Sequence, residues 1–300
     1  MINDQKTQDW IKAGEVAGRA LEHGKSLIKP GVMHVEVLDA VEKFIVENGA
    51  GIAFPAQISV NDIAAHQCAN NNEQTQFKEG DVVKLDVGAH VNGCIGDTAA
   101  TVDLGGNDLL VEASRDALKN ALKLAKPGTE VREIGKVIED SISAKGFKPI
   151  RNLSGHGLAE YNVHSKPTIP NFDNGDRTKL EEGQIIAIEP FATDGAGFVY
   201  EKGQATVYMQ VDKRPVRNPY AREVFKLIEG FGRLPFTLRW LTRKMSEMKV
   251  RIGLRELVRM DVVKAYPPLA EKNGGKVSQA EHSLIIAPEP RIITLVERRE

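Results

Sequence analysis

The chain has 300 residues, 41% hydrophobic and 27% charged, which is enough apolar material for one large domain or two ordinary ones. Its formal net charge is −1, so the chain as a whole is not built to bind nucleic acid or a membrane surface through charge. The opening MINDQKTQDW is polar and no apolar run reaches about 18 residues, so we expect neither a signal peptide nor a membrane span.

Apolar periodicity and turn residues predict helices and strands along the whole chain. In chain order we expect helices at about 5–24 and 33–48, strands near 52–60, 81–91 and 94–103, helices at about 108–125 and 130–145, and strands near 184–193, 203–210 and 277–287. The residues from about 211 to 272 form a basic, helix-rich block before the strand pattern returns. We interpret this block as an insertion into the second half.

Two segments recur in the same order, which predicts a duplicated architecture. LIKPGVMHVEVLDAVEKFIVENG (27–49) resembles LAKPGTEVREIGKVIEDSISAKG (124–146), and each predicts a Pro-Gly turn, an amphipathic helix and a terminating glycine. KEGDVVKLD (78–86) resembles EEGQIIAIE (181–189), and each copy ends in a carboxylate. Glu-Gly before an apolar strand is common by itself, but two successive matches favour duplication. Related halves would place Asp86 and Glu189 on opposite walls of one cleft.

Asp86 and Asp97 interrupt two apolar strands joined at Asn92-Gly93, a dipeptide that favours a two-residue hairpin turn. Such a turn places Asp86 opposite Ala99 and makes Asp97 its diagonal neighbour on the same face. A bulge would alter this register. Two ionised carboxylates on one inward face repel each other unless a cation lies between them.

Three further residues are candidates: His156 in NLSGHGL, Glu189 in IIAIEPF and Glu281 in SQAEHSLII. Both glutamates interrupt apolar, strand-like runs, as the two aspartates do. Taken singly, Glu189 can be a strand-end charge, Glu281 an edge-strand residue and His156 a loop or core histidine. Four inward carboxylates and a histidine could not share a core without metal. Oxygen-rich ligand sets suit divalent Mn, Fe, Co or Zn, and five ligands with bridging carboxylates suit a pair of ions.

These residues also resemble a known family. In this order, the five resemble the metal ligands of the pita-bread metallopeptidases, which include methionine aminopeptidases, aminopeptidase P and prolidase: Asp86, Asp97, His156, Glu189 and Glu281. FPAQISVNDIAAH (54–66), GHGLAEYNVH (155–164) and the basic block ending VVKAYPPLAEKNGG are similar to the type 2 methionine aminopeptidases. The N-terminus lacks the long charged extension of eukaryotic members, which implies an archaeal-type form.

The resemblance covers essentially the whole chain and implies a fold and an activity. The implied fold is an α+β pita-bread fold with halves related by a pseudo-twofold, forming a single catalytic domain over 1–300 with a helical insertion subdomain over 211–272. The implied activity is the removal of N-terminal methionine from nascent proteins and peptides with a small, uncharged second residue. Two divalent ions per chain, Co, Mn, Fe or Zn, would serve as cofactors.

The resemblance also implies a role for each site residue. Asp86 would chelate one metal, Asp97 and Glu281 would bridge both, and His156 with Glu189 would complete the other. The metals would hold a water molecule and lower its pKa, and Glu189 would act as general base. His66 and His164 would hydrogen-bond the scissile amide; without the resemblance, each is equally a packed or surface histidine.

Four residues are candidates for the pocket of the methionine side chain: Phe54, Val163, Phe191 and Tyr266. An aromatic residue in a chain of this length is as readily part of the core, so both interpretations stay open. Val207 stands where eukaryotic members carry a further histidine, which makes assignments in this part of the pocket less secure.

Other functions and partners remain to be separated. A prolidase or aminopeptidase P usually has an extra N-terminal domain, for which there is no room before residue 27, and lacks the insertion. A non-catalytic, ribosome-binding protein of this fold would have lost metal ligands, whereas all five are present. Residues 211–264 hold 14 Lys/Arg and 6 Asp/Glu, which indicates either a solvated surface or transient contact with ribosomal RNA.

The remaining expectations concern compartment and assembly. Cys68 and Cys94 lie far from any CxxC spacing, and we expect two reduced thiols in the cytoplasm. From the family resemblance we expect a monomer, with neither DNA nor a membrane as partner.

Overall fold

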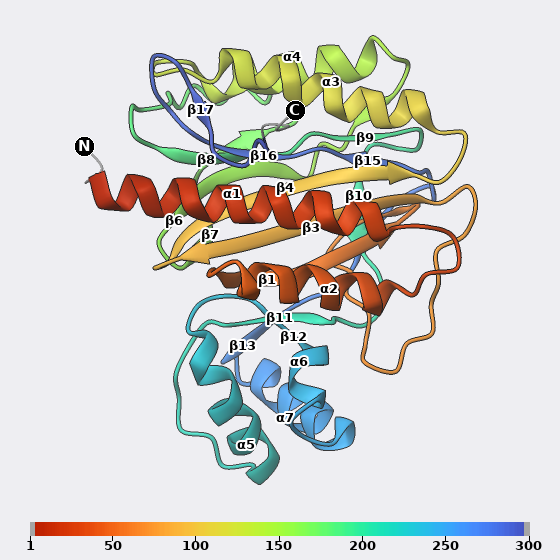
Figure 1. Cartoon of the computed structure of the whole chain (residues 1–300), viewed down its shortest axis with the longest axis vertical. Helices are drawn as coiled ribbons and strands as arrows, with labels where there is room; N and C mark the ends of the chain where they lie inside the picture. The colour runs from red at the N-terminus through yellow and green to blue at the C-terminus, as the bar shows by residue number, and fades with distance from the viewer. Residues whose placement is uncertain (1–3, 297–300) are drawn as a thin grey trace.

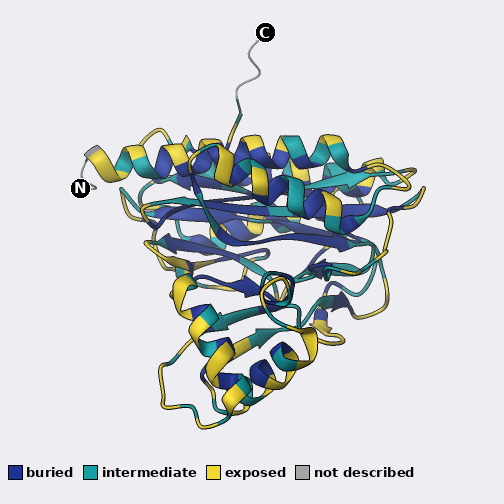
Figure 2. Ribbon diagram, turned by 60° about the horizontal axis from the view of Figure 1, so that its bottom comes forward, coloured by how far each residue is buried: buried dark blue, intermediate teal, exposed yellow. Residues whose placement is uncertain are grey.

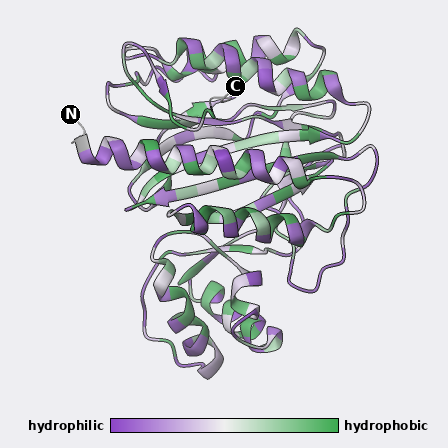
Figure 3. Cartoon of the chain, viewed as in Figure 1, coloured by the Kyte–Doolittle hydropathy of each residue, from purple (hydrophilic) through white to green (hydrophobic). Residues whose placement is uncertain are grey.

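Four long helices cover one face of the strands in the computed structural model, which describes residues 4–296 (Figure 1). Exposed residues lie on the outer side of these helices and buried residues run through the strands beneath them (Figure 2). The helices carry hydrophilic and hydrophobic residues in alternation (Figure 3), as a surface helix over a core requires. Residues 1–3, the start of the polar opening stretch, lie outside the described residues. Within 4–296, no helix has both the length and the apolar character needed to cross a membrane.

The first half packs two helices on a three-stranded antiparallel sheet of order β1-β3-β4. Its elements are α1 (Asp4–Leu27), α2 (His34–Glu47), β1 (Gly51–Val60), β2 (Ile63–Ala65), β3 (Val82–Val91) and β4 (Cys94–Asp103). Val83, Leu85 and Val87 of β3 belong to one buried core together with residues of α1 and α2. Because side chains alternate along a strand, Asp86 points to the face away from the helices.

The second half repeats this arrangement in a five-stranded sheet of order β17-β16-β8-β6-β7, in which β6-β8-β16 matches β1-β3-β4. The helices of the second half are α3 (Asp108–Leu124) and α4 (Val131–Ser143). The five strands of its sheet are β6 (Ser154–Ala159), β7 (Asn162–Pro170), β8 (Ile185–Ile188), β16 (His282–Ile285) and β17 (Arg291–Ile292). The second half also contains β5 (Lys148–Pro149), β9 (Phe191–Thr193) and β15 (Val277–Gln279). A second core joins α3 and α4 to this sheet.

The repeated sequence segments adopt the same local structure. Gly31 and Gly128 have φ of 85° and 88°, so the glycine of each Pro-Gly turn is left-handed. At the start of α2, the Glu36 carboxylate accepts the Met33 N–H, and at the start of α4 the Glu133 carboxylate accepts the Glu130 N–H. The two helices therefore begin in the same way, with the side chain of the third helical residue accepting a hydrogen bond from the backbone N–H of the residue just before the helix.

The two half-sheets are joined where β4 meets the start of β16. The Glu281 N–H donates to the Ala99 carbonyl at 2.8 Å, and the Thr98 hydroxyl donates to the Glu281 carbonyl at 2.8 Å. The Ser283 hydroxyl donates to the Asp97 carbonyl at 2.7 Å. Asp97 and Glu281 are therefore held on either side of the seam between the halves.

A helical subdomain with its own core lies at the opposite end of the molecule from α3 and α4 (Figure 1). It contains β11 (Val207–Gln210), α5 (Pro219–Ile228), the 3-10 helix η1 (Glu229–Phe231), β12 (Phe236–Thr237), α6 (Leu238–Thr242), α7 (Glu247–Arg259) and β13 (Val263–Tyr266). Its strands form a sheet of order β12-β11-β13, and a further sheet of order β10-β14-β2 links β10 (Val199–Glu201) and β14 (Leu269–Glu271) to the first half. The unit thus spans 207–266, close to the predicted 211–272, and its assignment as the type 2 insertion stays a prediction.

A buried arginine ties this subdomain to the first half. The Arg239 side chain on α6 is 0% exposed and forms ion pairs with Asp39 and Glu42 of α2. The Trp240 indole N–H donates to Glu42 at 2.8 Å, and the Asn71 side-chain amide donates to the Arg239 carbonyl at 2.9 Å. Because a buried guanidinium is costly without carboxylate partners, α6 is fixed against α2 and against the loop that contains Asn71.

Glu271 makes a comparable buried contact at the end of β14. Its carboxylate accepts backbone N–H groups from Ala196, Gly197, Asn273 and Gly275. Burial would by itself raise the pKa of Glu271, but these hydrogen bonds bring the pKa below its ordinary value. The carboxylate fastens the loop after β9 to the loop before β15.

Several predicted strands are shorter or broken. The single strands predicted at 184–193 and 277–287 are each two strands, because Pro190 has no N–H for the ladder. β8 pairs with β16 and β9 pairs with β15, and the four residues between these pairings leave the ladder: Glu189, Pro190, Ala280 and Glu281. The strand predicted at 203–210 contains only 207–210. The sequence pattern does not predict the remaining strands, which are β2, β5, β6, β7, β10, β12, β13, β14 and β17.

Candidate metal centre

The β3–β4 hairpin places two aspartates on the same inward face. Asn92 and Gly93 have φ of 51° and 88°, as a two-residue turn with two left-handed positions requires. Asp86 lies opposite Ala99, and Asp97 lies opposite Gly88, so the predicted diagonal relation of the two aspartates is confirmed. Asp97 is 3% exposed.

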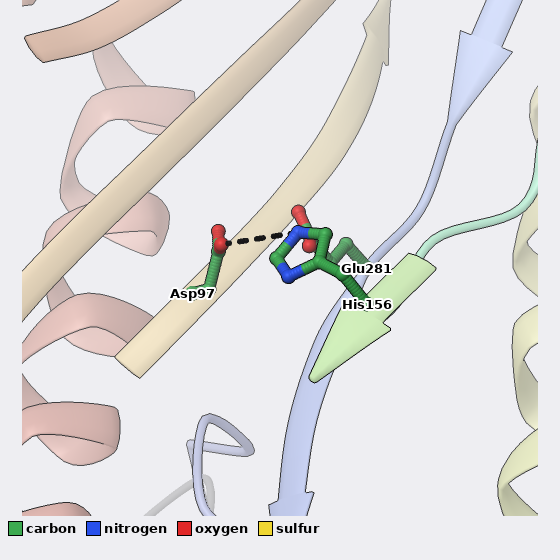
Figure 4. Close-up of side chains that lie close together, drawn as sticks. All are labelled: Asp97, His156 and Glu281. Carbon is green, nitrogen blue, oxygen red and sulfur yellow. Dashed lines mark ion pairs between the residues drawn. The ribbon is translucent and has the colours of Figure 1, made fainter. Parts of the chain in front are cut away.

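The second half contributes three residues to the same place. His156 lies on β6, Glu189 follows β8 and Glu281 precedes β16. His156 Nε2 is 3.5 Å from Glu189 Oε1 and 3.8 Å from Asp97 Oδ2. One ligand atom from each of Asp97, His156 and Glu281 lies within 4.8 Å of the other two, and their side chains converge from β4, β6 and the start of β16 (Figure 4).

Burial raises the pKa of each carboxylate in this cluster. The pKa of Asp86 rises to about 7. The pKa values of Asp97, Glu189 and Glu281 rise well above the ordinary range, first through burial and then through the neighbouring carboxylates. Asp86 Oδ1 is buried and has no hydrogen-bond partner. These groups are destabilised as anions by one another and by the loss of water.

The histidine is arranged as a ligand rather than as a counter-charge. Burial, followed by the nearby His164, lowers the pKa of His156 to about 3, so the ring is neutral near pH 7. His156 Nδ1 lies 3.2 Å from the Gly157 carbonyl, which can only accept, so Nδ1 carries the proton. The lone pair of Nε2 is therefore directed toward the carboxylates, as in metal-binding histidines.

These donors fit divalent cations. They line one cavity of 240 Å³ whose walls contain neither lysine nor arginine among the described residues. Four carboxylates face the lone pair of a neutral imidazole, and one carboxylate oxygen, Asp86 Oδ1, has no hydrogen-bond partner. These groups need positive charge between them. Carboxylate and imidazole donors are those that Mn, Fe, Co and Zn accept.

Two further histidines lie in the same cavity. His66 follows β2 with φ of 66°, and its backbone N–H donates to the Gln57 side chain at 2.8 Å. Burial lowers the pKa of His66 to about 4. His164 lies on β7 with its ring centre 4.6 Å from that of His156, edge to face. Both predicted histidines are thus beside the carboxylate cluster.

The predicted pocket residues also line this cavity, together with a residue that the sequence left uncertain: Phe54, Val163, Phe191, Tyr266 and Val207. The structure brings together every site residue expected from the sequence. The role of each, as ligand, base or pocket wall, is not tested by position alone and stays a prediction.

Two glutamines next to the carboxylates were missed by sequence reasoning. Gln57 on β1 lies opposite Asp86 and lines the cavity. The Gln279 side-chain amide donates to Glu189 Oε2 at 3.3 Å. Gln279 lies two residues before Glu281, and this spacing was the only sequence signal that could have placed Gln279 near the carboxylates. No such signal exists for Gln57, which lies beside Asp86 only because β1 pairs with β3.

Comparison with known proteins identifies the family. Residues 9–217 match metallopeptidase family M24. A methionine aminopeptidase of Archaeoglobus fulgidus is 46% identical over 294 residues, covering 98% of this chain and 99% of the relative. The chain belongs to metallopeptidase family M24. This M24 enzyme is a metallopeptidase hydrolase, and its activity is that of a methionine aminopeptidase.

Solved structures show the same fold at low sequence identity. A thermophilic Arx1 superposes with a TM-score of 0.86 at 17% identity, covering 100% of this chain and 93% of the other. A methionine aminopeptidase of Thermotoga maritima superposes with a TM-score of 0.72 at 23% identity, covering 98% of each chain. The predicted pita-bread fold of the M24 enzymes is confirmed.

Because the carboxylates repel one another, we expect removal of one of them to stabilise the metal-free M24 enzyme rather than destabilise it. In excess chelator at pH 8, Asp97→Asn is expected to raise the free energy of unfolding by about 1–3 kcal/mol, because it removes one uncompensated buried charge. The pKa of Asp97 is higher in the folded chain than its ordinary value of 3.8, so the folded state binds this proton more tightly. The destabilisation by wild-type Asp97 is therefore absent below about pH 4 and grows as pH rises.

Chemical denaturation from pH 4 to pH 8, with and without chelator, measures this effect. Glu15→Gln, at an exposed position on α1, is the matched control and should change little. With saturating Mn²⁺ the order should reverse, so that wild type is the more stable. Equal unfolding free energies of wild type and Asp97→Asn in chelator at every pH would contradict the electrostatic account.

Proposed function

We propose that the chain is a type 2, archaeal-type methionine aminopeptidase that removes N-terminal methionine from nascent proteins and peptides with a small, uncharged second residue. The observation that supports it is one cavity in which four carboxylates and His156 face two histidines and apolar walls. The separate helical unit at 207–266, between Glu189 and Glu281 in the chain, supports the type 2 assignment.

Asp86, Asp97, His156, Glu189 and Glu281 would hold two divalent ions, and Asp97 and Glu281, at the seam between the halves, would be ligands common to both. When bound, such ions supply Lewis acidity and lower the pKa of water to near neutrality. Glu189, whose Oε1 lies 3.5 Å from His156 Nε2, is the carboxylate that would accept a proton from the attacking water. Glu189 then donates that proton to the nitrogen of the leaving amine.

The two histidines have distinct roles in this proposal. His66 is neutral near pH 7, and its ring is hydrogen-bonded to the Pro267 carbonyl. Its other ring nitrogen can therefore only accept a hydrogen bond, which suits the N–H of the scissile amide. His164 is left to donate to the scissile carbonyl oxygen as negative charge develops there. His66 and His164 together orient the amide against the carboxylate cluster.

The methionine side chain is assigned to the apolar walls of the cavity. Phe54, Phe191 and Val163 are buried, whereas Tyr266 is half-buried. Val207 is buried and pairs with Tyr266 between β11 and β13, so it completes this wall. An unbranched apolar side chain packs against such a surface without leaving a polar group unpaired.

Peptide hydrolysis tests the substrate assignment. Met-Gly-Ser-amide should be cleaved after methionine, and Met-Leu-Ser-amide should show kcat/KM lower by at least about tenfold, because the second residue meets a shallow subsite. Ala-Pro-Ser-amide, a substrate for an aminopeptidase P, and the free dipeptide Ala-Pro, a substrate for a prolidase, should not be cleaved. Equal turnover of the Gly and Leu peptides would remove the second-residue preference, and preferred turnover of either Pro peptide would overturn the assignment.

Elemental analysis tests the metal assignment. Wild type should retain two ions per chain after loading with Mn²⁺ or Co²⁺, and Asp97→Ala should lose metal and activity together, because Asp97 is shared. His164→Ala is the matched control: it should lose activity and keep both ions. Unchanged metal content in Asp97→Ala would contradict the ligand assignment. Activity with each ion after anaerobic chelation would show which of Co, Mn, Fe and Zn serves best.

We also propose transient ribosome contact in the cytoplasm through the helical subdomain. Of its 14 basic residues, Arg239 and Arg243 pair with Asp39 of α2, and Arg214, Arg251 and Arg259 pair within the subdomain. The other nine have no ion pair within residues 4–296, and Arg222 and Lys226 are exposed on α5. Unpaired cations of this kind can contact RNA phosphates.

Co-sedimentation with ribosomes tests this contact. With about four phosphate contacts, binding should weaken about a hundredfold between 50 and 200 mM salt. A double variant, Arg222→Glu with Lys226→Glu, should bind more weakly, whereas Lys119→Glu on α3 should not. Binding that is absent, or that does not depend on salt, would end this proposal.

A further inference from the structure

A lysine without an ion pair among the described residues lies over an aromatic residue of the cavity wall. Lys264 lies on β13, two residues before Tyr266, and β13 is a strand of the helical subdomain on its side nearest the main sheet (Figure 1). The Lys264 side chain is exposed, and its ammonium lies 4.9 Å from the centre of the Tyr266 ring. Tyr266 in turn lines the cavity. No described residue forms an ion pair with Lys264, so its charge is compensated only by the aromatic face.

The ammonium is close to the position assigned to the scissile bond. The Tyr266 ring centre is 5.6 Å from that of His66, edge to face. The distance from the Lys264 ammonium to the centre of the His66 ring therefore cannot exceed the sum of this distance and the 4.9 Å between the ammonium and the centre of the Tyr266 ring. An extended peptide advances about 3.3 Å per residue, so the ammonium is within reach of the first three residues beyond the scissile bond.

The electrostatics of the two histidines agree with these distances. Burial lowers the pKa of His164, and the positive charge of Lys264 lowers it further. Lys264 also acts in the same direction on the pKa of His66, after burial and His164. One exposed cation is therefore felt at both residues assigned to the scissile amide, from the solvent side of the cavity.

We propose that Lys264 is a specificity-determining residue that binds an acidic side chain at the third or fourth residue of the substrate. The inference rests on the proposed function, because it requires the peptide to leave the cavity past His66 and Tyr266. The second residue must be small, so it cannot carry the carboxylate. Lys264 touches neither the reacting atoms nor the metal ligands, and its effect is on substrate binding.

The size of the effect follows from its exposure. An ion pair at a solvated rim changes affinity by about two- to fivefold, and salt screens it. The preference should therefore appear in KM rather than in kcat. Replacing the lysine by an acidic residue should reverse the preference, because the same position would then repel a carboxylate and attract an ammonium.

Steady-state kinetics of the metal-loaded enzyme on C-terminally amidated peptides test the proposal. Met-Gly-Asp-Gly-amide is compared with Met-Gly-Asn-Gly-amide and Met-Gly-Lys-Gly-amide, and a second set carries the same three residues at the fourth position. Asn matches Asp in shape, so the ratio of kcat/KM for Asp over Asn isolates the charge. In wild type this ratio should be about two to five in at least one set, and it should approach one in 0.5 M NaCl.

Four variants complete the experiment. Lys264→Met should bring the ratio to one, Lys264→Arg should preserve it and Lys264→Glu should favour the Lys peptide. Lys249→Glu is the matched control, because Lys249 also lies over an aromatic ring, 5.7 Å from the centre of Tyr220, but on α7 and not at the cavity. An unchanged ratio in Lys264→Met, or an equal change in Lys249→Glu, would overturn the inference.

The kinetics also separate this inference from the function on which it rests. If wild type cleaves the Asn peptides with no preference for Asp in either set, the Lys264 assignment fails and the methionine aminopeptidase assignment stands. If wild type does not cleave the Asn peptides at all, the proposed function fails and the Lys264 assignment fails with it.

Discussion

Repulsion among four carboxylates in one cavity, of which Asp97 and Glu281 are buried and Asp86 and Glu189 half-buried, is the constraint on which the rest of this structure depends. Within residues 4–296, no lysine or arginine lines the cavity and relieves it. Lys84 lies on the same face of β3 as Asp86, but its ammonium donates to the Asn61 and Val82 carbonyls. Arg239 is fully buried, but its partners are Asp39 and Glu42. The described residues supply no cation to the cluster, so we expect ion binding and stability to be coupled at this centre.

Duplication explains how one chain brings so much negative charge to one point. Strand order, left-handed turn glycines and reciprocal helix starts recur in both halves, so equivalent strands face each other across the seam. The halves nevertheless supply their ligands differently. The first uses an uninterrupted hairpin, whereas the second uses strands that leave the ladder at Glu189 and Glu281. The interruption frees both carboxylates to turn into the cavity.

The sequence predicted what depends on local pattern. Asn92-Gly93 defined the hairpin and hence the relation of Asp86 to Asp97, and carboxylates interrupting apolar runs marked the centre. Family resemblance, not spacing, linked His66 and His164 to it. What was missed depends on distant parts of the chain: the opposed breaks at Pro190 and Ala280, the pairing of Gln57 with Asp86, and the backbone cradle around Glu271. None of these leaves a periodic signal, because each partner is set by tertiary packing.

The Arg239 contact has a consequence for how freely the helical subdomain can be exchanged among enzymes of this fold. The same polypeptide segment that carries the guanidinium also carries Val207 and Tyr266 into the cavity wall. Removal of this segment would leave Glu42 buried without its Arg239 partner. It would also open the cavity to solvent on that side. A graft onto another scaffold would need matching acids on the recipient's second helix. The exchange of this subdomain is therefore limited by the two acidic residues on α2, Asp39 and Glu42, that pair with Arg239.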